Sequence, residues 1–214
     1  MHLYGHWRSI ASFRVRIALN LKGIPVETTF IDLARGEQNA PAYRAVNAQG
    51  VVPALVDDGG PPLVQSLAIL EYLDETHPQP SLLPMGARAR ARVRAIAQIL
   101  AADSHPLIVP RVRNYLQNEL KLDEPTRLKW IRYFLGEGAR AVEAHLTADG
   151  ATGRYAHGDT VTMADLCIAA HAAGCKLFEV DMSPYATFNR IAAECMQIDA
   201  FAKAHPLRQP DAPK

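Results

Sequence analysis

Two hydroxyl side chains and a cation immediately precede the first helical pattern, in the segment Arg8-Ser9-Ile10-Ala11-Ser12-Phe13. Backbone N–H groups and partial positive charge gather at the N-terminus of a helix. A ligand's thiol held there ionises more easily, and the thiolate is the nucleophile. Lowering a thiol pKa by two units corresponds to about 2.7 kcal/mol, and one hydroxyl hydrogen bond to a charged acceptor contributes about 1.5–3 kcal/mol. Ser9 or Ser12 could supply that bond, and of the two we expect Ser12 to be the N-cap of the helix.

Gln65 and Ser66 fall where a strand pattern ends and a helical pattern begins. Serine is a favoured N-cap residue, so Ser66 could simply cap the helix. The N-terminus of a helix also binds carboxylates through its unsatisfied N–H groups and its dipole. The position therefore has two interpretations, a helix cap or an anion site.

Val52 and Pro53 lie at the start of a predicted strand, where the missing N–H of proline costs least. The ordinary interpretation is a trans peptide bond. A cis bond would turn the backbone N–H and C=O of Val52 outward, as a template for an extended peptide.

Composition excludes several classes of protein. The 214 residues carry a formal net charge of +1, which gives no electrostatic argument for nucleic acid or an anionic membrane as a partner. The chain contains three cysteines, Cys167, Cys175 and Cys195. This odd and late set favours buried reduced thiols in a cytoplasmic protein over a disulfide framework. No membrane segment and no metal site are expected, because long apolar runs and clusters of ligand residues are missing from the sequence.

The first 77 residues alternate strand and helix patterns. Phe13, Ile17 and Leu21 recur at a spacing of four, and Leu67, Leu70 and Leu73 predict a second helix. Strands are predicted over residues 3–7, 26–33, 53–57 and 62–65, with an irregular helix within 34–47 and a turn at 58–60. The predicted order is βαβαββα.

A proline-rich segment, residues 78–86, follows the α/β region, and beyond it the patterns are helical only. Proline stiffens such a segment and stops the flanking elements from continuing through it. Thr162 and Asp165 form a capping box ahead of one of the later helices. The sequence therefore predicts an α/β domain over 1–77, a linker over 78–86 and an all-helical domain over 87–214.

Four motifs in chain order resemble those of a known family: Arg14-Val15-Arg16-Ile17-Ala18-Leu19, Gln65-Ser66-Leu67-Ala68-Ile69-Leu70-Glu71-Tyr72-Leu73, Gly158-Asp159 followed by Ala164-Asp165-Leu166, and Arg208-Gln209-Pro210-Asp211. Nearly end to end, the chain resembles a glutathione transferase, and more narrowly the zeta class, whose known members isomerise maleylacetoacetate or maleylpyruvate with glutathione. The resemblance implies a thioredoxin-like N-terminal domain followed by a helical C-terminal domain. It also implies glutathione as the cofactor, a homodimer and a role in aromatic catabolism.

The resemblance implies roles for residues of the N-terminal domain. Ser9 matches the family's leading serine, which makes it the candidate donor to the thiolate, with Ser12 the alternative, and Arg8 is a cation for the substrate. The family pairs the cysteinyl backbone of glutathione with the residue at Val52, which favours a cis Val52–Pro53 bond. The remaining matches place Gln65 and Ser66 at the γ-glutamyl carboxylate and Gln38 near the glycyl end.

In the helical domain, His105 matches a histidine that bacterial maleylpyruvate isomerases place beside the active site, and Arg111 follows soon after it. Both are candidates for the site, and Pro106 is expected to kink their helix. The implied chemistry is addition of the glutathione thiolate to a cis double bond, rotation about the resulting single bond and elimination as the trans isomer. A cation such as Arg8 would stabilise the negative charge that develops.

The sequence departs from the family pattern at two places. The chain has Ser9-Ile10-Ala11 where eukaryotic members have Ser-Ser-Cys, and no cysteine precedes Cys167, so chemistry with a protein thiol in this domain is excluded. The family's second carboxylate-binding arginine aligns with Leu177, and neighbouring Lys176 points about 100° away on a helix.

The second departure leaves two alternatives to a dicarboxylate isomerase. One is a transferase that conjugates or dehalogenates small electrophiles, with Leu177 supplying apolar surface. The other is a binding module without catalysis, which Ser9, Val52-Pro53 and Gln65-Ser66 argue against, because a scaffold would not need them.

Overall fold

The computed structural model describes residues 1–57 and 59–213, so the turn predicted at 58–60 lies partly outside the described residues. The chain forms two compact units, one of residues 1–82 together with 197–214 and the other of residues 83–196. This division differs from the predicted ranges in two respects: it divides the predicted linker between residues 82 and 83, and it places the C-terminal residues elsewhere. The last 18 residues belong with the N-terminal unit, because hydrogen bonds described below join them to its first helix and first loop.

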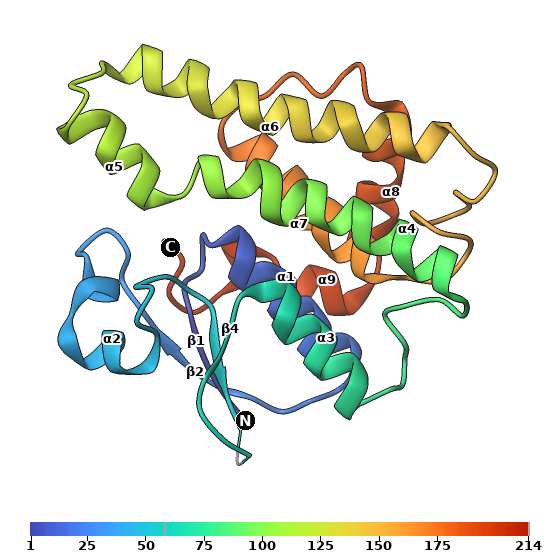
Figure 1. Cartoon of the computed structure of the whole chain (residues 1–214), viewed down its shortest axis with the longest axis horizontal. Helices are drawn as coiled ribbons and strands as arrows, with labels where there is room; N and C mark the ends of the chain where they lie inside the picture. Colours follow the sequence, from blue (N-terminus) through green and yellow to red (C-terminus); the bar gives the residue numbers. More distant parts are fainter. Residues whose placement is uncertain (58, 214) are drawn as a thin grey trace. The chain divides into compact units, whose positions relative to one another are not determined.

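The N-terminal unit contains a four-stranded sheet of order β2-β1-β3-β4 (Figure 1). The strands are β1 (His2–Gly5), β2 (Glu27–Phe30), β3 (Ala54–Val56) and β4 (Leu63–Val64). β1 pairs parallel with β2 and antiparallel with β3, and β3 pairs antiparallel with β4. The predicted order βαβαββα and the thioredoxin-like topology are confirmed, although each strand is shorter than its predicted range.

Helices lie on both sides of this sheet (Figure 1). On one side α1 (Ile10–Leu21) packs against α3 (Ser66–Thr76) and α9 (Asp199–Ala204). Phe13 and Ile17 of α1 are fully buried, as their spacing predicts. Because α1 has helices on two sides, its polar residues Arg14 and Arg16 are also buried.

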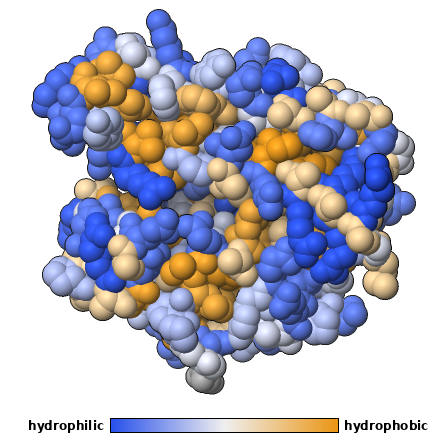
Figure 2. Space-filling model, viewed as in Figure 1, coloured by the Kyte–Doolittle hydropathy of each residue, from blue (hydrophilic) through white to orange (hydrophobic). Residues whose placement is uncertain are grey.

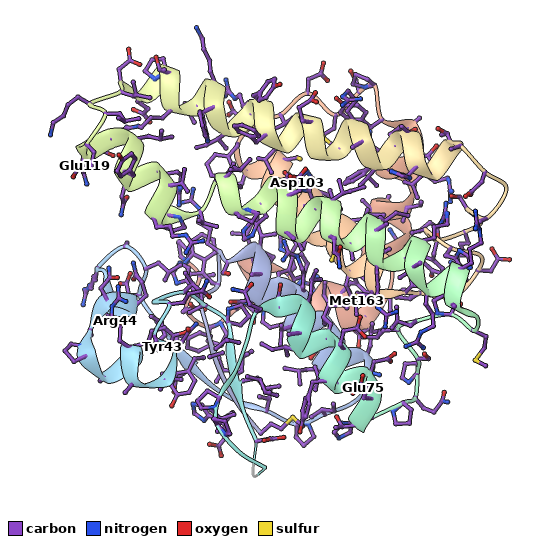
Figure 3. The ribbon with its side chains drawn as sticks, in the orientation of Figure 1. Tyr43, Arg44, Glu75, Asp103, Glu119 and Met163 are labelled. Atoms are coloured by element: carbon purple, nitrogen blue, oxygen red, sulfur yellow. The ribbon has the colours of Figure 1, made fainter. Side chains whose placement is uncertain are left out.

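On the other side of the sheet lie the 3₁₀-helix η1 (Glu37–Asn39) and α2 (Pro41–Val46), the helix that carries the labelled Tyr43 and Arg44 in Figure 3. Tyr43 packs with Ile31 and Val52 in a buried cluster. This cluster holds α2 against the residues that precede β3.

The predicted linker is partly fixed to the N-terminal unit. The fully buried ammonium group of Lys22 donates to Asp74 Oδ1 (3.1 Å), the His77 carbonyl (2.6 Å) and the Pro80 carbonyl (2.9 Å). Asp74 Oδ1 also accepts a 2.7 Å hydrogen bond from the N–H of Leu82. These hydrogen bonds explain why the N-terminal unit extends to residue 82.

The second unit is helical, as predicted. It consists of α4 (Ala87–Gln98), the π-helix η2 (Ile99–Ser104), the 3₁₀-helix η3 (His105–Leu107), α5 (Pro110–Asn118), α6 (Glu124–Thr147), α7 (Met163–Leu177) and α8 (Ala186–Met196). α7 packs against α4, α6 and α8. Its N-terminus has the predicted capping box between Thr162 and Asp165.

On the face in Figure 2, hydrophobic residues form separate patches between hydrophilic ones. Large apolar side chains that remain exposed include Met85, Tyr133 and Leu207. Within the part of the chain that the structure describes, no helix is both long and apolar enough to cross a membrane.

Candidate functional site

Four segments with predicted ligand residues adjoin the same end of the sheet. Ala54 at the start of β3 is opposite both Tyr4 near the end of β1 and Val64 at the end of β4. Gly5 and Phe30, the last residues of β1 and β2, are also opposite each other. The loop with Arg8 and Ser9 follows β1, the residues up to Gln38 follow β2, Val52-Pro53 precedes β3 and Gln65-Ser66 follows β4. The register therefore brings the ligand segments predicted for this unit to one end of the sheet.

Ser9, and not Ser12, is the N-cap of α1, which corrects the sequence prediction. The Oγ atom of Ser9 accepts a 3.1 Å hydrogen bond from the backbone N–H of Ser12. The helix begins at Ile10, so Ser12 lies in its first turn, where it is fully buried. A hydroxyl group that accepts this bond keeps its own proton for donation. Ser9 is partly exposed, whereas Ser12 is not.

Arg8 is exposed and directly precedes Ser9. Its position in the β1–α1 loop puts a guanidinium group beside the N-terminus of α1, where the helix dipole adds further positive potential. This end of α1 therefore favours an anion.

Ser66 is the first residue of α3, and Gln65 before it has φ +70°. Gln65 Nε2 donates a 2.7 Å hydrogen bond to Gln49 Oε1. The Ser66 hydroxyl accepts a 2.8 Å hydrogen bond from Nη1 of Arg14, whose side chain is buried. Ser66 thus joins a helix N-terminus to a buried cation, and both features attract a carboxylate.

Sequence reasoning did not select Arg14 as a site residue. Arg14 lies in one of the motifs that carry the resemblance, but the sequence of a helix does not show which residue the side chain of an arginine will contact. Only the packing of α1 against α3 makes Ser66 its partner.

The Val52–Pro53 peptide bond is cis, the isomer that the resemblance favours. The preceding carbonyl of Val51 accepts a 2.7 Å hydrogen bond from the Tyr43 hydroxyl and another of 2.7 Å from Asn47 Nδ2. Within residues 1–57 and 59–213, the backbone N–H and C=O of Val52 have no hydrogen-bond partner. Val52 therefore offers both backbone groups to a ligand on a fixed piece of chain.

Gln38 lies in η1 and is buried, and its Oε1 atom has no hydrogen-bond partner among the described residues. Gly50 allows η1 to come this close, because it has φ +62° and a Cβ there would lie 3.0 Å from the Gln38 carbonyl oxygen. A buried amide oxygen without a partner is costly, so a ligand that donates a hydrogen bond to Gln38 Oε1 would remove that cost.

The two predicted residues of the helical unit follow a change in helix type. The π-helix η2 precedes His105, and η3 contains Pro106. The regular α-helix α4 ends at Gln98, eight residues before Pro106, where the kink was predicted. Proline lacks an N–H and its ring collides with the carbonyl four residues earlier, which is consistent with the π-helical turns that lead up to it. His105 is half-buried, and Arg111 is exposed in the first turn of α5.

Leu177 is the last residue of α7, and its side chain is 43% exposed. The adjacent Phe178 contacts cations from two other helices. The guanidinium carbon of Arg113 in α5 lies 5.7 Å from the Phe178 ring centroid, and Nε of Arg132 in α6 donates a 2.8 Å hydrogen bond to its carbonyl. The sequence analysis did not select these two arginines, since their partner is distant in sequence.

The three cysteines are free and buried, as predicted. Burial raises the pKa of Cys175 to about 12 and raises the pKa of Cys195 as well. No group of three or more His, Cys, Asp or Glu residues within 1–57 and 59–213 could hold a metal ion. The predicted residues at the end of the sheet supply hydroxyl, amide, backbone and guanidinium groups.

Comparison with known proteins identifies the family. Residues 1–75 match the model of the glutathione S-transferase N-terminal domain. The chain is 43% identical over 211 residues to the maleylpyruvate isomerase of a Ralstonia species, with 99% of each chain covered.

Solved structures agree. The maleylacetoacetate isomerase of Methylobacterium extorquens AM1, with bound malonate and GSH, is 50% identical with a TM-score of 0.98 over 100% of both chains. A bacterial maleylpyruvate isomerase of the zeta class is 42% identical with a TM-score of 0.96 over 100% of both chains. This chain belongs to the zeta class of glutathione transferases, the family of the maleylacetoacetate and maleylpyruvate isomerases.

Proposed function

We propose that this protein is a glutathione-dependent cis–trans isomerase of the maleylacetoacetate or maleylpyruvate type, acting in aromatic catabolism. The observation that carries the proposal is the Ser9 N-cap at the N-terminus of α1. It supplies a hydroxyl hydrogen-bond donor at the position where family members activate the thiol of glutathione. The relatives that match along their full length are named as isomerases of these substrates.

The residues at the end of the sheet fit glutathione. The unpartnered N–H and C=O of Val52 suit the cysteinyl backbone, beside the cis Pro53. Gln65 and the N-terminus of α3 at Ser66 suit the γ-glutamyl carboxylate. The unpartnered amide oxygen of Gln38 suits the backbone N–H at the glycyl end, from which it can accept a hydrogen bond. These assignments bind a tripeptide by its backbone and its γ-glutamyl carboxylate.

When bound, glutathione supplies a thiolate that adds to the substrate's activated double bond and is eliminated after rotation. Ser9 donates a hydrogen bond from its hydroxyl group to that sulfur, while its oxygen stays fixed by the Ser12 N–H. The dipole of α1 stabilises the same negative charge. Ser12 is the weaker candidate, because its hydroxyl is fully buried beneath Gly5.

Arg8, His105 and Arg111 are the residues that the resemblance assigns to the substrate, and it assigns His105 to glutathione as well. Arginine binds carboxylates bidentately, which suits a dicarboxylate. Malonate, bound in the Methylobacterium structure, is a small dicarboxylate. Arg8 additionally stabilises the negative charge that develops on the conjugated carbonyl of the substrate.

A second candidate function is conjugation or dehalogenation of small electrophiles. The exposed Leu177 favours it, because this position carries an apolar side chain where the family has a carboxylate-binding arginine. The two functions differ in substrate charge, so one set of assays separates them.

We further propose a cytoplasmic homodimer. The three free, buried thiols are typical of a reducing compartment. Met85, whose side chain is 94% exposed, is a large apolar group of the kind that interfaces cover. Sedimentation of the purified protein tests the dimer.

The deciding experiment follows glutathione-dependent conversion of maleylpyruvate and maleylacetoacetate spectroscopically, in the wild type and in Arg8→Ala and Ser9→Ala. Arg140→Ala is the control, because Arg140 is an exposed arginine of α6 whose ion pair is with Glu137 of the same helix. We expect turnover that falls at least tenfold in the two site variants and stays unchanged in the control. Tight glutathione binding without turnover would instead support the conjugation function.

A further inference from the structure

The C-terminal tail, here residues 199–213, contacts the loop that carries Arg8 and Ser9. Oδ2 of Asp211 accepts a 2.8 Å hydrogen bond from the backbone N–H of Trp7, across 204 positions of sequence. The same oxygen lies 3.7 Å from Nδ1 of His6. The end of the chain is therefore bonded two residues before the proposed thiol-activating serine.

Arg16 of α1 makes a second connection between the same loop and the tail. Its guanidinium group donates to the His6 carbonyl (3.2 Å), the Trp7 carbonyl (3.1 Å) and the Ala204 carbonyl (3.1 Å). Arg16 is buried, so its hydrogen bonds face little competition from water. Between them, Arg16 and Asp211 bind both the N–H and the C=O of Trp7.

We propose that Asp211 and Arg16 are positioning residues: the C-terminal tail holds the β1–α1 loop so that the Ser9 hydroxyl is directed at the glutathione sulfur. This inference rests on the proposed function. The N–H of Ser9 already bonds to the His6 carbonyl (3.1 Å), so a shift of residues 6 and 7 is transmitted directly to Ser9. Hydrogen bonds to a thiolate depend on sub-ångström placement of the donor.

The sign of the effect separates positioning from simple electrostatics. Asp211 carries negative charge near the N-terminus of α1, so its charge alone opposes a thiolate there. Neutralising Asp211 would lower the pKa of the bound thiol if charge were its only influence. If its role is to position Ser9, losing the hydrogen bond to Trp7 raises that pKa.

The test measures the pKa of the glutathione thiol on the protein from thiolate ultraviolet absorbance against pH, together with kcat and KM. The variants are Asp211→Ala, Asp211→Asn and Arg16→Lys. Asparagine keeps an oxygen that can accept from Trp7, whereas a lysine cannot span the three carbonyls that Arg16 binds. Asn20→Ala is the matched control, since it removes a 3.0 Å bond from α1 to the Ala200 carbonyl of the tail, away from the loop.

We expect Asp211→Ala and Arg16→Lys to raise the bound thiol's pKa by about one unit and to lower kcat about tenfold. KM should change less than kcat, Asp211→Asn should retain most of the wild-type pKa, and Asn20→Ala should behave as wild type. If Asp211→Ala does not fold, the thiol pKa of Arg16→Lys tests the same positioning role with Asp211 intact.

An unchanged or lowered thiol pKa in both Asp211→Ala and Arg16→Lys would overturn the inference. An Asn20→Ala effect as large as that of Asp211→Ala would overturn it too, because tail stability in general would then be responsible. A wild-type protein that binds glutathione without forming thiolate, or that binds none, would instead refute the proposed function itself.

Discussion

Nη1 of Arg14 donates a 2.8 Å hydrogen bond to the Ser66 hydroxyl, which connects α1 to the N-terminus of α3 through a buried positive charge. The hydroxyl accepts from arginine and so keeps its proton for a ligand. The pair combines the chemistry of an arginine with the placement of a helix N-terminus.

We therefore expect Arg14→Met to weaken glutathione binding about tenfold, or about 1.4 kcal/mol, with a smaller effect on kcat. Titration calorimetry measures the binding. The double variant with Ser66→Ala completes a thermodynamic cycle, and the two losses should be non-additive because the residues share one hydrogen bond. Strictly additive losses would show that Arg14 acts independently of Ser66.

Ser9 combines a cap and a proposed proton donor, and two substitutions separate these roles. Ser9→Ala should lose about 1 kcal/mol of stability with the cap, whereas Ser9→Gly should lose only a few tenths. Both remove the hydroxyl, so both should lower turnover similarly, at least tenfold. Urea unfolding and steady-state kinetics measure the two effects. Turnover that followed stability instead would mean that the cap matters and the proton does not.

The buried carboxyl group of Asp165 stabilises the N-terminus of α7, and replacing one of its oxygen atoms should destabilise the protein. It accepts from the Thr162 N–H (2.7 Å), the Thr162 hydroxyl (2.8 Å) and the Ala156 N–H (2.7 Å). Asp165→Asn replaces one acceptor oxygen by a donor and should cost about 2–4 kcal/mol of unfolding free energy. Asp123→Asn is the control, because it changes an exposed N-cap where asparagine serves equally well. Equal stabilities of the two variants would contradict this account.

The same carboxyl should give the stability a pH dependence. Burial raises the pKa of Asp165 to about 6, against the hydrogen bonds that it accepts. Its unfolded pKa is near 4, so between pH 4 and 6 the native state holds the extra proton, and stability falls as pH rises. The advantage of the wild type over Asp165→Asn should be about 2–3 kcal/mol greater at pH 4 than at pH 7. A constant difference would show that Asp165 stays ionised in the native state.

Leu177→Arg tests which substrate class the helical unit serves. An arginine at the C-terminus of α7 is compatible with the helix dipole, and Leu177 is exposed enough to accept it. We expect KM for maleylpyruvate to fall about threefold to tenfold, with glutathione binding unchanged. Leu177→Gln is the uncharged control. Equal KM values in the two variants would mean that no substrate carboxylate reaches this position.

Local patterns in the sequence predicted helices well where a buried apolar face or a capping motif determines where the helix lies. The spacing of Phe13 and Ile17 places α1, and the Thr162–Asp165 pair places the start of α7. The strands extend less far than predicted, because β-branched residues favour extended chain but only pairing defines a strand.

The serines at 9 and 12 show where such reasoning stops. Either could cap a helix, and the choice depends on whether the helix begins at Ile10 or three residues later. The docking of the C-terminal tail could not be predicted either, because the partners of Arg16 and Trp7 lie 188 and 204 positions away in sequence. Long-range hydrogen bonds leave no periodic trace in a sequence.

The bond between Trp7 and Asp211 also orders the events of biosynthesis. A ribosome delivers the strands of the N-terminal unit first, then residues 83–196, and residue 211 after both. The unit that emerges first therefore acquires its complete set of hydrogen bonds only after the whole helical unit has been synthesised. A nascent chain stalled before residue 211 would hold a sheet whose first loop lacks its hydrogen bond to Asp211.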